Sequence, residues 1–241
     1  MQIHELLDRL ELISPNNTFF TDLRKTILNN DQFALFRLLQ QQTSSQLVEG
    51  LRKYKDNTEF NADCFSRGQL ESKLWLVKEL QKTKVDLGTV FLCAGWYATL
   101  ATMLFESSIT VDKIRSFDID DTCRDIAETF NKPWVKDNWK FKSSTKDIMD
   151  INYEFERYEV IRADGTTCPL DDTPDTIINT SCEHIENFEE WYAKIPVGKL
   201  VILQSNNFFD VDEHVNCVED CTQLRITAPM TTQLYAGELQ L

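Results

Sequence analysis

The spacing of apolar positions changes character near residue 88. Before that point, leucines recur at helical spacing, as at Leu6, Leu7 and Leu10. Apolar residues three and four positions apart are typical of amphipathic helices. We therefore expect residues 1–82 to form an N-terminal helical cap or substrate subdomain, and residues 83–241 to form a second domain.

After residue 88, short apolar segments alternate with helical ones. The segments expected to be strands are 89–93, 114–119, 175–179 and 199–203, and the expected helices are 97–106, 121–130 and 186–194. Continuous apolar segments of this length suit strands that are buried on both faces of a parallel sheet. Strands that alternate with helices indicate βαβ units and a doubly wound sheet.

Three further segments complete the expected α/β architecture. We expect 223–228 and 232–240 to be strands that close the sheet, and 153–169, with its Asp164-Gly165 turn, to be an inserted hairpin. The charged stretch 210–220 is expected to form a solvated helix face. The fold class predicted is a doubly wound, seven-stranded, mostly parallel α/β sheet with an N-terminal helical subdomain.

The net charge and the lack of long apolar segments limit the classes of partner that we expect. The chain of 241 residues carries 25 Lys and Arg against 39 Asp and Glu, a formal net charge of −14. This acidic balance disfavours nucleic acid and anionic membranes as partners, because both attract basic surfaces. No segment approaches the roughly 18 apolar residues of a membrane helix, and no signal peptide is visible, so we expect a cytoplasmic protein. A small-molecule substrate is expected, and the oligomeric state is open, with a homodimer as one option.

The cysteines and histidines do not form a metal-binding motif in the sequence. The seven cysteines include no CxxC pair, and the three histidines, His4, His184 and His214, lack ligand spacing near them. We therefore expect reduced thiols that pack as small apolar side chains, and no metal site.

The candidate chemistry lies after the expected strands. Gly95 follows the first strand and allows close backbone approach, and Asp118 ends the second strand at roughly the 20-residue spacing of an acid that holds a ribose. One glycine is too few to cradle a pyrophosphate well, and no GxxxxGK[ST] motif is present. The pattern favours a ligand that contains a nucleoside, although a strand-end acid is also common as a solvated group.

Over roughly residues 85–241, this order of motifs resembles the class I S-adenosylmethionine-dependent methyltransferases. The resemblance implies that S-adenosylmethionine is the cofactor and that Asp118 binds its ribose, Ile119 packs on the adenine, and Asp147 meets the adenine amino group, with Asp150 as an alternative. The cofactor-binding residues that the resemblance implies are Cys93, Gly95, Trp96, Tyr97, Asp118, Ile119, Asp147 and Thr180.

The loop after the first strand departs from the family pattern of acid-x-Gly-x-Gly-x-Gly. Cys93 stands in place of the acid, and Trp96 and Tyr97 follow a single Gly95. An aromatic face attracts a sulfonium cation, so this pair could grip the cofactor. Simple packing is the alternative interpretation.

The segment after the fourth strand, Asn179-Thr180-Ser181-Cys182-Glu183-His184-Ile185, resembles the family motif near the reacting group. His184 is a candidate proton acceptor, since its ordinary pKa suits base chemistry near neutrality. Glu183 could orient it or bind a substrate amine, and Asn179 could hold the substrate or cap the loop. The candidate catalytic residues are His184, Glu183 and Asn179.

Substrate-binding candidates come from elsewhere in the chain. They are Arg67, Gln69, Asn206 and His214. Arg67 and Gln69 also belong to Ser66-Arg67-Gly68-Gln69, which matches a helix capping box, so a purely structural role is an alternative for both.

Three functions follow as hypotheses. The first is a transferase that methylates a small molecule, by positioning and proton removal. The second uses S-adenosylmethionine without methyl transfer and releases methylthioadenosine, by cyclisation to azetidine-2-carboxylate or by aminocarboxypropyl transfer. The third is a protein that binds the cofactor without turnover.

Overall fold

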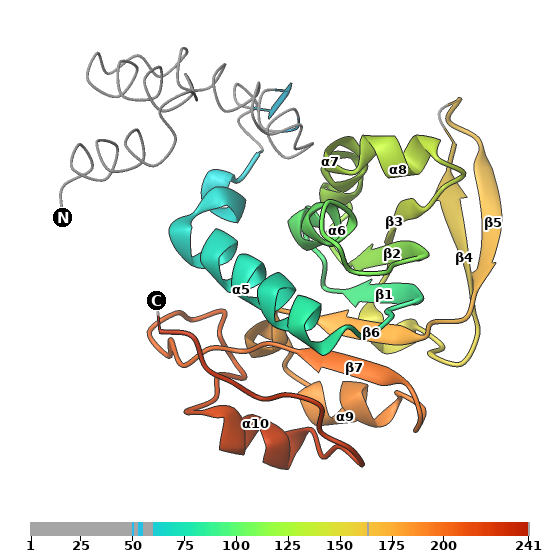
Figure 1. Ribbon diagram of the computed structural model, residues 1–241. Coiled ribbons are helices and arrows are strands. Elements are labelled where there is room, and N and C mark those ends of the chain that lie inside the picture. Colours follow the sequence, from blue (N-terminus) through green and yellow to red (C-terminus); the bar gives the residue numbers. More distant parts are fainter. Residues whose placement is uncertain (1–49, 51–52, 55–59, 163, 241) are drawn as a thin grey trace, which may run out of the picture. The chain divides into compact units, whose positions relative to one another are not determined.

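The computed structural model describes residues 50, 53–54, 60–162 and 164–240 (Figure 1). The chain divides into two compact units, Met1–Lys53 and Tyr54–Leu241. Most of the predicted N-terminal helical region, including His4, lies outside the described residues. The division at residues 82 and 83 and the role of a helical cap therefore stay predictions.

The second unit is built on a parallel sheet. Its strands are β1 (Thr89–Cys93), β2 (Lys113–Asp118), β3 (Phe141–Thr145), β6 (Thr176–Asn179) and β7 (Leu200–Leu203). They pair in the order β3-β2-β1-β6-β7, and every pairing is parallel. Because β2 and β6 flank β1 on opposite sides, the chain reverses direction across the sheet at β1, where open α/β sheets bind ligands at their carboxyl ends.

Helices and a hairpin complete the unit (Figure 1). The helices are η1 (Ala62–Phe65), α5 (Arg67–Thr83), α6 (Thr99–Phe105), α7 (Cys123–Phe130), α8 (Lys132–Lys136), η2 (Ile148–Asp150), η3 (Cys182–His184), α9 (Phe188–Ala193) and α10 (Cys221–Thr227). The antiparallel hairpin consists of β4 (Glu156–Ile161) and β5 (Thr167–Asp172).

Both faces of the sheet are buried, as the continuous apolar segments predict. All five side chains of β1 are buried. On one face, Phe91 and Phe117 pack with Trp191 of α9 and with the β4–β5 hairpin. On the other face, α5, α6 and α7 contact one another in sequence. This two-sided burial keeps the strand ends in fixed positions, and the candidate site is built there.

An ion-pair network attaches the hairpin to the sheet. Asp172 of β5 accepts hydrogen bonds from Lys113 Nζ at 2.8 Å, from Arg115 Nε at 2.7 Å and from Tyr158 Oη at 2.7 Å. Burial opposes ionisation of this carboxyl, but the donors outweigh it and lower the pKa of Asp172 below its ordinary value. A buried carboxylate needs such partners, because breaking a buried pair typically costs about 3–5 kcal/mol.

The central strands and helices are confirmed, and the C-terminal prediction is wrong. The expected strand 223–228 is helix α10, whose N-cap Asp220 accepts a hydrogen bond from Gln223 N at 2.9 Å. Residues 232–240 form no strand, and within the described residues the parallel sheet has five strands rather than seven. Residues 153–169 do contain the hairpin predicted from Asp164-Gly165, and β3 and α8 are elements that periodicity alone did not predict.

The charged stretch 210–220 is not a helix. It forms turns, because its backbone N–H groups donate hydrogen bonds to other segments. Asn216 N donates to Glu183 O at 2.8 Å, and Val218 N donates to Asn206 O at 2.9 Å. A helix would use these groups internally. The stretch is therefore attached to the carboxyl ends of β6 and β7.

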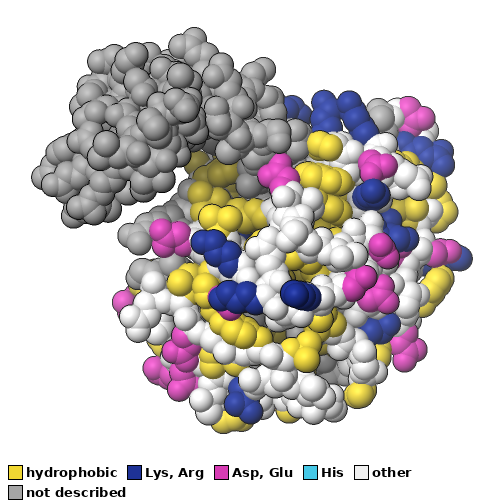
Figure 2. Space-filling model, viewed as in Figure 1, with side chains coloured by type: hydrophobic (Ala, Val, Ile, Leu, Met, Phe, Trp, Pro, Cys, Tyr) yellow, Lys and Arg dark blue, Asp and Glu magenta, His cyan; other side chains and the backbone are white. Residues whose placement is uncertain are grey.

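In the described part of the chain, no helix has the length and apolar character needed to cross a membrane. On the face that Figure 2 shows, acidic and basic side chains are interspersed with apolar ones.

Candidate functional site

The candidate site lies along the carboxyl ends of the parallel strands. We divide it into two parts: the β1–β3 edge, which comprises residues 93–98, 118–120 and 145–150, and the β6–β7 edge, which comprises residues 179–185 and 204–218. Each is described in turn.

The loop after β1 has an unusual backbone. Ala94, Trp96 and Ala98 have φ angles of 50°, 49° and 50°, in the left-handed region. Non-glycine residues are seldom found there, and strain of this kind is concentrated at functional sites. Gly95 lies between them, and a Cβ on it would come within 2.2 Å of Ser116 Oγ. The loop therefore packs directly on β2, and position 95 requires glycine for close approach.

Asp118, at the end of β2, fixes this loop. Its Oδ2 accepts a hydrogen bond from Trp96 N at 2.7 Å, and its Oδ1 accepts one from Asp120 N at 3.1 Å. Burial raises the pKa of Asp118, and these hydrogen bonds offset part of the rise. The next residue, Ile119, is 72% exposed. A half-buried acid beside an exposed apolar side chain matches the predicted pair for a ribose and an adenine.

The third strand brings a second acid to the same edge. Lys146 N donates to Asp118 O at 2.8 Å and so joins the ends of β2 and β3. Asp147 is half-buried and caps η2, where its Oδ1 accepts from Met149 N at 2.8 Å. Asp150, the alternative, is exposed.

Two predicted cofactor residues point into the protein instead. Cys93 is fully buried, and its Sγ lies 3.5 Å from Tyr153 Oη; burial raises the pKa of this thiol to about 12. Tyr97 is 3% exposed and stacks on Phe60 at 5.4 Å between ring centroids. Only their backbones lie at the edge. Trp96 is half-exposed and stacks on Tyr97 at 4.8 Å, so of the aromatic pair it is the one with an accessible ring.

Asn179 begins the β6–β7 edge. It is fully buried, and its Oδ1 accepts a hydrogen bond from Ser181 N at 2.9 Å. Its Nδ2 finds no hydrogen-bond partner among the described residues. Asn179 therefore caps the loop, as the sequence suggested, and its Nδ2 is a donor without a partner in the described ranges. Thr180, next in the chain, is half-exposed.

Glu183 is the buried acid of this edge. It is 8% exposed, and its Oε1 accepts a hydrogen bond from Asn206 Nδ2 at 2.9 Å. Its Oε2 is buried and unpartnered within the part of the chain that the structure describes. Burial raises the pKa of Glu183, against the opposing charges of His184, His214 and Lys73.

Two histidines lie beside this carboxylate. His184 and His214 meet edge to face, 4.7 Å between ring centroids, and His184 Nε2 is 4.0 Å from Glu183 Oε1. Each ring bonds to a backbone carbonyl through Nδ1: His184 to Glu213 O at 3.1 Å and His214 to Phe208 O at 2.8 Å. Since a carbonyl only accepts, each Nδ1 carries a proton, and in the neutral tautomer the lone pair of each ring is on Nε2.

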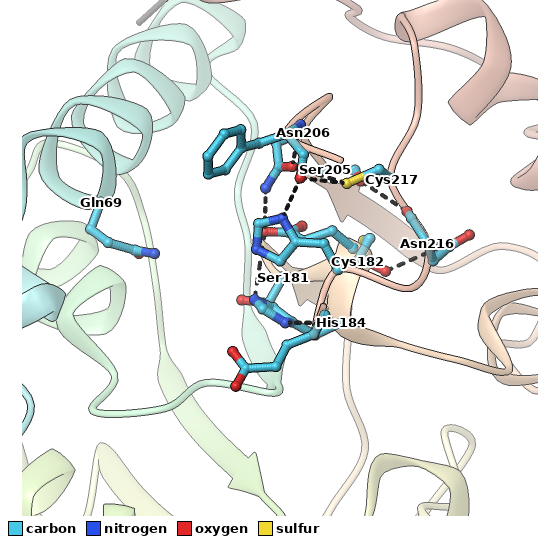
Figure 3. A network of polar contacts seen from close by, with 12 residues as sticks. Gln69, Ser181, Cys182, His184, Ser205, Asn206, Asn216 and Cys217 are labelled. Atoms are coloured by element: carbon cyan, nitrogen blue, oxygen red, sulfur yellow. Dashed lines mark hydrogen bonds and ion pairs between the residues drawn. The ribbon is translucent and has the colours of Figure 1, made fainter. Parts of the chain in front are cut away.

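Helix α5 faces this network. Figure 3 shows Gln69 on α5 pointing toward Ser181 and His184, with Asn206 and Cys217 on the other side. Gln69 accepts a hydrogen bond from Lys73 Nζ. Burial lowers the pKa of Lys73 to about 8, although the negative charge of Glu183 works in the opposite direction.

The capping box is only half formed. Ser66 Oγ accepts from Gln69 N at 3.4 Å, as predicted, but the side chain of Gln69 bonds to Lys73 instead of returning to the cap. The side chain of Arg67 lies outside the described residues, so its predicted role stays a prediction.

The structure thus brings together two of the three residues that the sequence assigned to catalysis and two of its substrate candidates. Glu183, His184, Asn206 and His214 form one network, because the 204–218 segment folds back on η3. The sequence also offers Lys73, with Arg67 and Gln69, as a group that could reach towards a ligand carboxylate. In the structure Lys73 follows Gln69 by one helical turn and donates to its side chain.

Comparisons with known proteins find distant similarity to solved structures. No protein-family model and no curated protein matches the chain. Among solved structures, an S-adenosylmethionine-dependent methyltransferase from Clostridium acetobutylicum is 10% identical, with 61% of this chain and 55% of that chain covered and a TM-score of 0.40. The N-methyltransferase NodS from Bradyrhizobium japonicum is 10% identical, with 64% and 70% covered and a TM-score of 0.42.

The chain covers about half the length of the first structures that it matches. At such low identities and TM-scores, the assignment of the fold rests on the strand order of the sheet itself. That order, β3-β2-β1-β6-β7 with all strands parallel, is consistent with the class I methyltransferase fold.

Proposed function

We propose that this chain is an S-adenosylmethionine-dependent transferase that methylates a small molecule. The observation that carries the proposal is the arrangement at the β1–β3 edge. Asp118 there is hydrogen-bonded to the strained loop after β1 and is followed by the exposed Ile119. A carboxylate suits the two ribose hydroxyls, and an exposed apolar side chain suits the adenine face.

The β6–β7 edge supplies groups for the acceptor. Methyl transfer requires positioning of the acceptor and removal of its proton. With Nδ1–H donated to Glu213 O, the neutral ring of His184 carries its lone pair on Nε2, where it can accept a proton. Phe208 and Val215, each 57% exposed, offer apolar contact beside these polar groups. The substrate class that fits is a small molecule with an apolar part and a nucleophilic oxygen or nitrogen.

The cofactor assignment is tested by calorimetric titration of the full chain with S-adenosylhomocysteine. Asp118→Asn keeps the size of the side chain and removes its charge. We expect this variant to bind about 10- to 100-fold more weakly, the loss of a hydrogen bond to a charged group. Asp121→Asn, a change at an exposed acid on the same loop, should bind as the unaltered chain does. Equal binding by both variants would remove the ribose assignment.

The reaction type is tested by incubation with S-adenosylmethionine alone, read by mass spectrometry against a control without protein. We expect tight binding and no consumption of the cofactor until an acceptor is added. Rapid release of methylthioadenosine would overturn methyl transfer in favour of cyclisation or aminocarboxypropyl transfer. Absence of binding would overturn the cofactor assignment.

A further inference from the structure

Two imidazoles and one carboxylate meet at the carboxyl ends of β6 and β7. One nitrogen or oxygen from each of Glu183, His184 and His214 lies within 4.8 Å of the other two. Ligand atoms around a tetrahedral ion with bonds of about 2.0–2.1 Å are roughly 3.4 Å apart. Small side-chain rotations would therefore close this cluster on one ion.

The hydrogen bonds behind the cluster are those of metal-binding histidines. His184 and His214 each donate Nδ1–H to a backbone carbonyl, of Glu213 and Phe208 respectively. A histidine that binds metal through one ring nitrogen generally donates the other N–H to such an acceptor, which fixes its tautomer and orientation. In the neutral tautomer that these hydrogen bonds select, the lone pair of each ring is on Nε2.

The carboxylate offers a second, independent indication. Glu183 is 8% exposed, its Oε1 is held by Asn206 Nδ2, and its Oε2 has no hydrogen-bond partner in the described ranges. An unpaired buried carboxylate oxygen is costly. Coordination to a cation would satisfy this oxygen, and Asn206 already orients the group.

We propose that Glu183, His184 and His214 bind one divalent transition-metal ion. Two imidazole nitrogens and one carboxylate oxygen suit Zn²⁺, Co²⁺ and their first-row neighbours rather than Mg²⁺ or Ca²⁺, which prefer oxygen ligands only. Three protein ligands leave a coordination position open, as in catalytic rather than structural sites. The open position would hold water or an oxygen or nitrogen of the acceptor. Binding of the ion does not depend on the proposed transferase activity, but it would occupy the His184 nitrogen that the transferase proposal offers as proton acceptor.

The test uses the full chain after removal of metal by a chelator, with Co²⁺ as a spectroscopic probe and Zn²⁺ in calorimetry. We expect one ion per chain and visible d–d absorption from nitrogen and oxygen ligands. Thiolate-to-cobalt charge-transfer absorption should be absent, because no cysteine belongs to the proposed ligand set. A tenfold excess of Mg²⁺ should leave Co²⁺ bound.

The following variants distinguish metal binding at this site from metal binding at the chain's other histidine, His4. Glu183→Gln, His184→Ala and His214→Ala should each abolish the Co²⁺ spectrum, and Asn206→Ala should weaken Zn²⁺ binding about 10- to 100-fold, as changes behind metal ligands do. His4→Ala is the matched control and should bind as the unaltered chain does. Thermal unfolding in the presence of chelator verifies that each variant is folded.

Three results would overturn the proposal: no Co²⁺ spectrum in the unaltered chain, a thiolate spectrum, or equal binding by His214→Ala and His4→Ala. Because no S-adenosylmethionine is present, none of these results tests the cofactor assignment at the β1–β3 edge. Conversely, failure to bind the cofactor would leave the metal site intact.

Discussion

The β1–β3 edge and the β6–β7 edge lie at the same side of one sheet, but the hydrogen bonding of their polar groups differs. At the first, both oxygens of Asp118 are occupied by backbone donors of adjacent loops. At the second, Asn179 Nδ2 and Glu183 Oε2 are buried without a partner among the residues described. Buried polar groups are generally paired. The first edge is therefore held rigid by hydrogen bonds to Asp118, whereas the second has buried polar atoms available to a ligand.

From this difference we expect the β1–β3 edge to determine cofactor affinity and the β6–β7 edge to determine turnover. Backbone strain and Asp118 hydrogen bonds fix the shape of the β1–β3 edge, so changes there should alter stability and cofactor affinity. The β6–β7 edge holds Glu183 and the two histidines, so changes there should alter turnover. Four predictions test that division, from the largest expected effect to the smallest.

The first prediction concerns Glu183. Glu183→Gln keeps the side-chain volume and removes the charge that lies beside His184 and His214. Once an acceptor is identified, we expect turnover to fall about 10²- to 10⁴-fold, the usual contribution of a group engaged in proton transfer. S-adenosylhomocysteine affinity, set at the other edge, should change little. Single-turnover kinetics and calorimetry measure the two quantities.

Glu186→Gln is the matched control for this change, because Glu186 is an exposed acid three residues further on. Its turnover should equal that of the unaltered chain. A loss of cofactor affinity in Glu183→Gln as large as the loss of turnover would contradict the separation of the two edges.

The second prediction concerns Gly95. A Cβ at this position would come within 2.2 Å of Ser116 Oγ and 3.2 Å of Leu92 Cγ. Gly95→Ala should therefore lower the free energy of unfolding by about 1–3 kcal/mol, the usual effect of overpacking. Denaturant unfolding followed by circular dichroism measures the change.

A double-mutant cycle gives the control. Ser116 Oγ is buried and has no partner in the described part of the chain, so Ser116→Ala alone should cost little. The double variant Gly95→Ala/Ser116→Ala should recover most of the lost stability. Strict additivity of the two single changes would show that the contact is not the cause.

Gly95 and Asp118 show how much of the β1–β3 edge could be predicted from the sequence. Gly95 and Asp118 were predictable because Gly95 lies in the loop after one apolar strand and Asp118 ends another, and parallel strands place their carboxyl ends at one edge. The packing of Gly95 against Ser116 was not, because it depends on the register between β1 and β2.

The β6–β7 edge was predictable only in part. Glu183 and His184 lie in η3, shortly after β6, but their contact with His214 depends on the long-range hydrogen bonds of the 204–218 segment to η3. The charge pattern predicted a helix for 210–220. A prediction from local sequence takes no account of backbone groups that form hydrogen bonds with distant residues. The C-terminal strands failed differently: Asp220 is a sound helix-capping signal that the apolar pattern of 223–228 outweighed.

The third prediction concerns the pH dependence of Lys73. Burial lowers the pKa of this amine to about 8, with opposing contributions from Glu183, Cys64 and Asp63. Between pH 8 and the unfolded value of about 10.4, the unfolded chain binds the proton and the folded chain does not, so the Lys73 contribution to stability rises with pH. Lys73→Met removes this contribution.

The measurement is the free energy of unfolding of both proteins across that interval. The advantage of Lys73→Met should be largest below pH 8 and should diminish towards pH 10.4. Lys78→Met, at an exposed position of the same helix, is the control and should show no such trend. A constant difference between Lys73→Met and the unaltered chain would contradict the lowered pKa.

The smallest effect is expected at Ala94, and it tests whether the β1–β3 edge stores strain. Its φ of 50° costs an alanine about 1–2 kcal/mol and costs glycine almost nothing, whereas glycine loses about 0.5–1 kcal/mol more backbone entropy on folding. Ala94→Gly should therefore raise the free energy of unfolding by about 0.5 kcal/mol. Ala101→Gly, inside α6, should lower it, because that backbone is already helical. If the strain serves to hold the loop against Asp118, the more stable Ala94→Gly variant should nevertheless bind S-adenosylhomocysteine no more tightly, since the flexibility of glycine must then be lost on binding.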